Sequence, residues 1–214
     1  KTIHLDELNL HYLEAGEGEP VLLLHGWPTS SYLWRNVMPS MAKTNRVIAL
    51  DLPAFGKSSK NVADSYSFFY YERVIEGLLD ALGIEKTGLA VHDLGGPIGI
   101  FWALRHPDKV SRLALLNTLV YPEVSWMVKL FVFASIAPGL RWWLSSPAGL
   151  TWAMRFGVEN KQNITAEVAI QYYKPYVSKD DRNALLKTAS GLSPKGFKVI
   201  EEKLPTLSVP VRII

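Results

Sequence analysis

Short apolar runs alternate with helical patterns along most of this 214-residue chain. Runs that fit strands buried on both faces of a sheet lie at 21–24, 46–50, 88–92, 112–117 and 211–214, and alternating patterns at 2–5 and 8–13 predict two more strands. Helices are expected at 32–43, where Pro39 bends or divides the helix, at 67–82, where Gly83 ends the pattern, and from Gly95 to about His106. Buried strands that alternate with helices predict a parallel α/β sheet.

The alternation stops between Leu119 and Pro210. This stretch has no clear strand, and its large aromatic residues recur at helical spacing: Trp126, Trp142, Trp143, Trp152, Tyr172, Tyr173 and Tyr176. We therefore predict a core at 1–118, a helical cap at 119–205 and the start of a returning core strand at 206–214. The cap is expected over the carboxyl edge of the sheet, where open α/β sheets bind ligands.

Composition and charge exclude several classes of protein. The chain is 48% hydrophobic and 20% charged, which is ordinary for a globular domain and excludes collagen-like and disordered chains. Its 23 basic and 20 acidic residues give a net charge of +3 without a block of like charges, so we expect no nucleic-acid partner.

Other features argue against metal, cofactor and membrane binding. There is no Cys, and the five His residues have no metal-ligand spacing, so we expect neither a metal nor a cofactor. The apolar stretch at 124–140 is interrupted by Lys129, Pro138 and Gly139 and is too short to span a bilayer. We expect a cytoplasmic protein with no membrane partner.

The segment Val91–Gly96 carries the clearest chemical signal. It joins a buried strand to a helix through small residues, which is the context of a nucleophile elbow with Asp93 at its tip. The backbone N–H of Leu94 would then face an oxyanion at the helix N-terminus. The structural alternative is that Asp93 caps the helix, a position that Asp favours.

A second loop, His25-Gly26-Trp27-Pro28, follows the first buried strand. In folds with such an elbow this loop supplies the other oxyanion donor, here the backbone N–H of Trp27. We expect His25, Gly26, Pro28 and Gly95 to support the site structurally, with Pro28 either cis or trans.

Two other polar residues lie near these loops. Asp51 ends a strand, and we expect it to anchor a loop rather than to take part in the reaction. His92 precedes Asp93, and because side chains alternate along a strand, it is not assigned as a base.

Three segments resemble haloalkane dehalogenases: His25–Asn36, Asp51–Ser58 and His92–Pro97. Epoxide hydrolases share these landmarks more loosely, and Val91 favours the dehalogenases because epoxide hydrolases usually have Gly there. The resemblance covers 8–117, is weak in the cap, and implies an α/β-hydrolase fold with an aspartate nucleophile.

The implied chemistry explains why a carboxylate stands at the elbow. An Asp with a pKa of about 3.9 is ionised at neutral pH and needs no base to attack an sp³ carbon that bears a halide or an epoxide oxygen. The product is an alkyl ester on Asp93. A His-activated water then attacks the ester, and the N–H groups of Trp27 and Leu94 stabilise the oxyanion.

The chain departs from the family pattern at the halide site. Dehalogenases usually have Trp after the nucleophile, where this chain has Leu94, which has no side-chain donor. The indoles of Trp27, Trp142 and Trp143 are the alternative halide donors, and Tyr172 is among the cap tyrosines that could serve an epoxide. We expect Trp27, Trp142, Trp143 and Tyr172 to contact the substrate.

The resemblance also implies a catalytic acid and a catalytic His after the strand that begins at Val211. No His follows His106, so we expect a chain that lacks about the last quarter of the protein. The favoured hypothesis is a dehalogenase-like hydrolase of small apolar substrates that uses water. The alternatives are an epoxide hydrolase and a non-catalytic ligand-binding protein or inactive fragment. The oligomeric state stays open.

Overall fold

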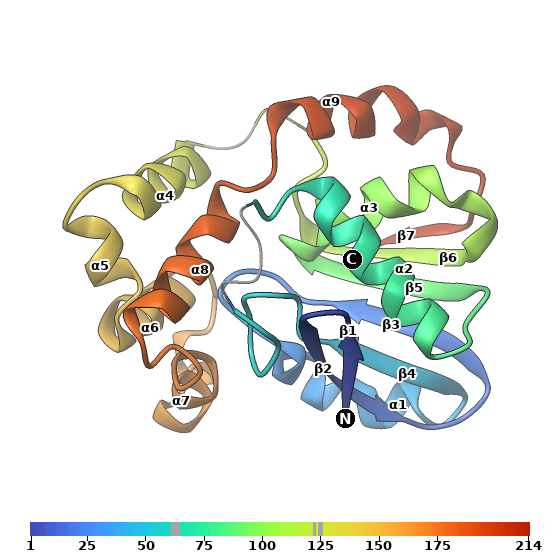
Figure 1. Cartoon of the computed structure of the whole chain (residues 1–214), viewed down its shortest axis with the longest axis horizontal. Helices are drawn as coiled ribbons and strands as arrows, with labels where there is room; N and C mark the ends of the chain where they lie inside the picture. The colour runs from blue at the N-terminus through green and yellow to red at the C-terminus, as the bar shows by residue number, and fades with distance from the viewer. Residues whose placement is uncertain (61–64, 122, 124–125) are drawn as a thin grey trace.

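A mostly parallel sheet forms the centre of the molecule (Figure 1). The computed structural model describes residues 1–60, 65–121, 123 and 126–214. Within them, the strands are β1 (Thr2–Leu5), β2 (Leu8–Ala15), β3 (Glu19–Leu24), β4 (Asn45–Leu50), β5 (Thr87–Asp93), β6 (Val110–Thr118) and β7 (Val211–Ile213). Their spatial order is β1-β2-β4-β3-β5-β6-β7, and only the pairings of β1 with β2 and of β2 with β4 are antiparallel.

The two faces of the sheet have separate apolar cores because side chains alternate along each strand. Leu22 and Leu24 of β3 pack in the larger core, which includes α2 (Phe68–Ala81) and α3 (Gly95–Arg105). Val21 and Leu23 face the other way and pack near Trp34 and Met38. These two residues come from the 3₁₀ helix η1 (Ser31–Asn36) and the short helix α1 (Met38–Met41).

The helix predicted at 67–82 is present as α2. The segment predicted as a helix at 32–43, bent or divided by Pro39, is divided. Ser67 caps α2, since its side chain accepts a hydrogen bond from the Tyr70 N–H. Between 31 and 41 the chain forms η1 and then α1, with Pro39 in the first turn of α1. A proline fits a first turn but not a helix interior, because it has no N–H to donate.

Five α-helices lie on the left of Figure 1, beyond the carboxyl ends of the parallel strands. They are α4 (Trp126–Ile136), α5 (Leu140–Leu144), α6 (Pro147–Phe156), α7 (Ala166–Tyr173) and α8 (Lys179–Ala189), with the 3₁₀ helix η3 (Lys161–Asn163) between α6 and α7. We call α4 to α8 the cap. The described residues of 119–205 contain no strand, as the sequence predicts.

The next helix, α9 (Pro194–Lys203), packs on the core rather than on the cap. Ile200 is fully buried in the main core, and the ring centroids of Phe197 and Phe68 are 5.4 Å apart. The 3₁₀ helix η4 (Leu204–Thr206) then leads to β7, which pairs with β6. The boundaries predicted for the cap, 119–205, stay a prediction. Helix α9 lies within that range but packs on α3 of the core. Residues 122, 124 and 125 of the range lie outside the described residues.

Candidate active site

The turn from β5 to α3 holds Asp93 in a strained backbone conformation. Asp93 ends β5 with φ at 49°, a left-handed value that non-glycine residues rarely adopt. Leu94 follows as the N-cap of α3. The Thr118 hydroxyl donates a hydrogen bond of 2.7 Å to the Asp93 carbonyl oxygen and so ties the turn to β6. This is the sharp strand-to-helix turn that raises a side chain above a sheet.

Close packing explains the small residues around this turn. A Cβ on Gly95 would lie 2.5 Å from the His25 carbonyl oxygen and 2.6 Å from that of Leu24. A Cβ on Gly26 would overlap the Asp93 side chain. The two loops therefore approach each other at a distance that only glycine allows.

The loop after β3 aims a backbone donor at the Asp93 carboxylate. The Trp27 N–H donates a hydrogen bond of 2.8 Å to Oδ1 of Asp93. The Trp27–Pro28 peptide bond is cis, and the Thr29 N–H donates to the Gly26 carbonyl at 2.9 Å. The structure thus brings Trp27 and Asp93 together, while the oxyanion role of Trp27 and Leu94 stays a prediction.

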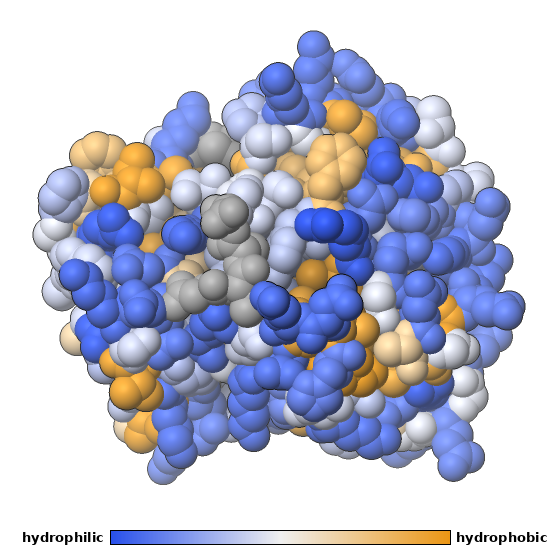
Figure 2. Space-filling model, viewed as in Figure 1, coloured by the Kyte–Doolittle hydropathy of each residue, from blue (hydrophilic) through white to orange (hydrophobic). Residues whose placement is uncertain are grey.

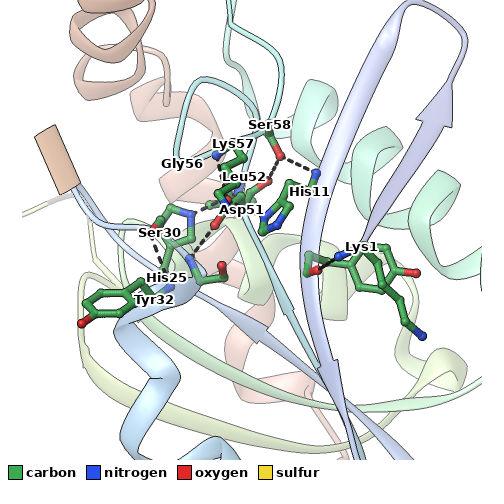
Figure 3. A network of polar contacts seen from close by, with 12 residues as sticks. Lys1, His11, His25, Ser30, Tyr32, Asp51, Leu52, Gly56, Lys57 and Ser58 are labelled. Carbon is green, nitrogen blue, oxygen red and sulfur yellow. Dashed lines mark hydrogen bonds and ion pairs between the residues drawn. The ribbon is translucent and has the colours of Figure 1, made fainter. Parts of the chain in front are cut away.

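His25 lies fully buried beneath this loop, and both of its ring nitrogens have backbone partners (Figure 3). Its Nδ1–H donates to the Gly26 carbonyl at 2.9 Å, and its Nε2 accepts from the Leu52 N–H at 3.1 Å. Burial lowers the pKa of His25, although the nearby Asp51 opposes that shift. A neutral imidazole held by two loops is what a structural anchor requires.

Asp51 is the centre of a second buried network (Figure 3). Its carboxylate accepts hydrogen bonds from the Ser31 N–H at 2.6 Å, the Lys57 N–H at 2.9 Å and the His11 Nδ1–H at 2.9 Å. Burial alone would raise the pKa of Asp51, but its hydrogen bonds, led by that of His11, outweigh burial and lower it. These contacts are those of a loop anchor, as expected from the sequence.

Two features of these networks could not be predicted from the sequence. His11 is far from Asp51 along the chain, and only the antiparallel pairing of β2 with β4 brings them together. The Asp93–Thr118 contact likewise depends on the pairing of β5 with β6. The alternating pattern at 8–13 predicts the strand that carries His11, but not its partner.

The other histidine near Asp93 has no assigned role in the chemistry. His92 precedes Asp93 on β5, and its Nδ1 is buried without a hydrogen-bond partner. Burial lowers the pKa of His92, although the adjacent Asp93 opposes that shift. His92 therefore favours the neutral form at this position.

The indole of Trp27 is engaged by the cap. Its Nε1–H donates to the Leu185 carbonyl of α8 at 3.3 Å, and its ring lies edge-on to Phe131 of α4 at 4.4 Å. That hydrogen bond competes with halide for the donor. The Trp27 indole is therefore placed as part of a pocket wall rather than as a halide donor.

The other three residues expected at the substrate lie in different environments. Trp142 is half-buried, with the Arg141 and Lys179 cations 5.2 and 5.1 Å from its ring. Trp143 is exposed and packs against Trp152. None of the contacts recorded for Trp142 or Trp143 involves Asp93, so their predicted contact with substrate has no support from the packing.

Tyr172 is buried at the base of the cap. Its ring lies edge-on to Tyr32 at 5.7 Å, and burial raises its pKa to about 12. The phenol therefore stays protonated at neutral pH. Its placement is that of a packing residue between α7 and η1, and its predicted contact with substrate is untested.

The part of the chain that the structure describes has neither a cluster of metal ligands nor a membrane-spanning helix. Those residues include no group of three or more His, Asp or Glu that could hold a metal ion. None of their helices is long and apolar enough to cross a membrane. The predicted cytoplasmic location remains a prediction.

The sequence and the fold were compared with known proteins. A family model described as "alpha/beta hydrolase fold" matches residues 19–148, which is more than half of the chain. A haloalkane dehalogenase from Sphingobium indicum is 36% identical over 130 residues, or 59% of this chain and 44% of the relative. A soluble epoxide hydrolase from Corynebacterium is 39% identical over 110 residues, or 51% of this chain and 38% of the relative.

A solved structure is similar over the whole chain. The haloalkane dehalogenase DatA from Agrobacterium tumefaciens superposes with a TM-score of 0.80 at 25% identity, covering 100% of this chain and 77% of the other. The chain thus spans less than half the length of the two curated relatives above and about three quarters of this structure.

Proposed function

Because this chain belongs to the alpha/beta hydrolase fold family, we propose that Asp93 forms a covalent alkyl ester with substrates of the haloalkane dehalogenase class. The predicted fold class is confirmed by the family match and by the mostly parallel sheet. The observation that carries the proposal is the geometry of Asp93. Its backbone is strained at φ 49°, and its carboxylate accepts a hydrogen bond from the Trp27 N–H. Strain of this kind is concentrated at functional sites.

The first step of the proposed reaction is a displacement at carbon. One Asp93 carboxylate oxygen attacks the sp³ carbon, the carbon–halogen bond breaks, and the halide leaves with the bonding electron pair. Asp93 needs no base for this step. The Trp27 N–H, 2.8 Å from Oδ1, holds the carboxylate in one orientation, so that the other oxygen, Oδ2, is the attacking atom.

The second step is hydrolysis of the ester. Water attacks the ester carbonyl carbon, and the Trp27 and Leu94 N–H groups stabilise the oxyanion before the alcohol leaves and the carboxylate reforms. This step needs a general base. In the structure, hydrogen bonds or ion pairs engage His25, His11 and His106 elsewhere. An ester that forms faster than it is hydrolysed accumulates on Asp93 and can then be detected.

Epoxide opening is the second candidate, and two observations favour it. Leu94 offers no side-chain donor for a halide, and the Trp27 indole donates to Leu185. The Corynebacterium relative is named as a soluble epoxide hydrolase. In this reaction Asp93 attacks an epoxide carbon, the ring C–O bond breaks, and the alkoxide takes a proton from solvent water to give a hydroxyalkyl ester.

Mass spectrometry of the intact chain tests both candidates. After incubation with 1-bromobutane, the chain gains a butyl group in place of one hydrogen. After incubation with styrene oxide, it gains the whole epoxide. Tandem spectra are expected to place the adduct on Asp93.

The matched variants are Asp93→Asn and Asp108→Asn, because Asp108 is an exposed carboxylate in the 3₁₀ helix η2 (Pro107–Lys109), which follows α3. We expect D93N to lower the rate of adduct formation by roughly 10³-fold or more, and D108N to leave it unchanged. An adduct that forms equally fast on D93N, without deamidation to Asp, would contradict the mechanism. A ligand that binds tightly without forming any adduct would favour the non-catalytic alternative.

A further inference from the structure

Helix α4 exposes its apolar side chains and buries a polar one. Trp126 is 71% exposed and Phe133 is 56% exposed, whereas Ser135 on the opposite side of the helix is 2% exposed. Helices of water-soluble domains usually have the opposite arrangement. The exposed residues Trp126, Leu130 and Phe133 are spaced four and three apart, so they form one stripe along the helix.

The stripe belongs to a larger exposed surface. Exposed large apolar residues continue from α4 through α5 into α6: Trp126, Leu130, Phe133, Ile136, Leu140, Trp143, Trp152 and Phe156. We call this set the cap apolar face. Orange atoms at the upper left of Figure 2, in the area of α4, show apolar side chains on this surface. Scattered exposed apolar residues are normal, but eight on three successive helices indicate an interaction surface.

The rings at one end of the face contact each other. Trp143 and Trp152 have centroids 5.4 Å apart, and Trp152 stacks on Phe156 at 5.2 Å. A groove beside them is lined by Pro147, Ala148, Thr151, Trp152, Arg155 and Tyr173. Tryptophan is the residue that membrane proteins concentrate at the bilayer interface, because its ring is apolar and its N–H is polar.

The charged side chains on the three helices of this face have one sign. Residues 126–158 contain three basic side chains, Lys129, Arg141 and Arg155, and no acidic one, while Glu123 and Glu159 lie just outside this range. On a helical wheel Lys129 falls between Phe133 and Ile136, inside the cap apolar face. Arg155 lies in the groove beside Trp152. An apolar face that also carries basic residues is complementary to an anionic lipid surface.

We propose that the cap apolar face docks on an anionic lipid bilayer, with α4 lying in the interface. The basic residues Lys129, Arg141 and Arg155 oppose pairing with a second copy of the same face, because like charges would then meet. Docking also needs no spanning helix, since an interfacial helix inserts only its apolar side. The inner side of α4 contacts Trp27 through Phe131, so docking places α4 between the bilayer and the loop that contacts Asp93.

Vesicle flotation tests the proposal on the full chain. The probes are phosphatidylcholine vesicles with and without phosphatidylglycerol. We expect the chain to float with the anionic vesicles, to bind pure phosphatidylcholine at least several-fold more weakly, and to be released by high salt. Absence of binding to anionic vesicles at low salt would overturn the proposal.

Two pairs of variants identify the surface. The double variant Leu130→Ser, Phe133→Ser should bind at least tenfold more weakly, whereas Val177→Ser, at a 79% exposed apolar position outside the face, should bind like the parent chain. Lys129→Glu should weaken binding severalfold, and Lys86→Glu, on the exposed core surface, should have a smaller effect.

Thermal melting of each variant checks that it is folded. If the double variant melts like the parent chain and still binds the vesicles fully, the docking surface is elsewhere and the proposal is wrong. A different result is that the parent chain forms dimers, the double variant stays monomeric, and neither binds vesicles. The face would then be a self-association surface, and the proposal would also be wrong.

Discussion

Two aspartates, one after β4 and one at the end of β5, have opposite environments. Asp51 follows β4, is 2% exposed, and accepts hydrogen bonds from Ser31, Lys57 and His11. Asp93 ends β5 and is half-buried, and its Oδ1 accepts a hydrogen bond from the Trp27 N–H. Its backbone has φ at 49°, whereas Asp51 is not among the residues with positive φ.

The difference separates a structural carboxylate from a reactive one. A carboxylate that accepts three hydrogen bonds in a buried site is stabilised and has little remaining lone-pair capacity for attack on carbon. A carboxylate on a strained turn with few hydrogen-bond donors lowers the stability of the fold, but its oxygens stay accessible to a ligand. The sequence places both residues after apolar strands, so the distinction depends on what surrounds each one.

The largest expected difference is in the free energy of unfolding. Asp51→Asn should lower it by about 3 kcal/mol, because the amide cannot accept from the same three donors and the change breaks a buried charged network. Asp93→Asn should change it by less than about 1 kcal/mol, since Asp93 is only half-buried. Urea unfolding of both variants measures this. Equal losses for the two would mean that Asp93 is also a structural anchor.

The pH dependence of stability should distinguish the same pair. The pKa of Asp51 is lowered in the folded chain, so its stabilisation is present above the ordinary value of 3.8 and is lost as the pH falls through the folded pKa. Urea midpoints measured from pH 5 down to pH 2 should therefore fall steeply for the parent chain and less steeply for Asp51→Asn. Parallel curves for the two chains would contradict this role of Asp51.

A smaller effect should reveal the strain at Asp93. The φ of residue 93 is 49°, a left-handed value that is unfavourable for alanine but not for glycine. Asp93→Gly should therefore be more stable than Asp93→Ala by about 1 kcal/mol. The same pair of substitutions at Asp51 serves as the control, and there alanine should be at least as stable as glycine. Thermal melting of the four variants gives both comparisons. If alanine is the more stable at both positions, the turn at Asp93 is unstrained.

The smallest expected effect concerns the hydrogen bond that holds the Asp93 turn. Thr118→Val keeps the side-chain shape but removes the donor to the Asp93 carbonyl, which should cost about 0.5–1 kcal/mol. On the proposed function, adduct formation on Asp93 should slow several-fold as the turn loosens. Thr151→Val is the control, because its hydroxyl bonds only to Pro147 within its own helix. Equal adduct rates for both variants would show that the bond does not position Asp93.

Most of the sheet and one long helix could be predicted from the sequence because their signals are local. The apolar runs at 21–24, 46–50 and 88–92 lie within β3, β4 and β5. The pattern at 67–82 gives α2, with Tyr71, Ile75 and Leu78 fully buried. At 32–43 the sequence left open whether Pro39 bends or divides the helix, and only the structure shows that a new helix begins beside it.

The candidate site was predictable only in part. The positions of Asp93 and Trp27 follow strand ends, and parallel strands bring those ends to one edge. The exposure of Trp143 and the buried packing of Tyr172 were not predictable, because aromatic residues at helical spacing are found both in cores and in pockets.

The sequence by itself determined the alternation of strands and helices, the carboxylate at the elbow and the family resemblance, because each depends on residues close together along the chain. The tertiary structure alone decided which aspartate is fully hydrogen-bonded, which indole donor is engaged, and which side of α4 faces water. Those properties depend on partners far apart in sequence, such as His11 for Asp51 and Leu185 for Trp27. Hydrogen bonding and burial act between neighbours in space, and only the folded chain defines those neighbours.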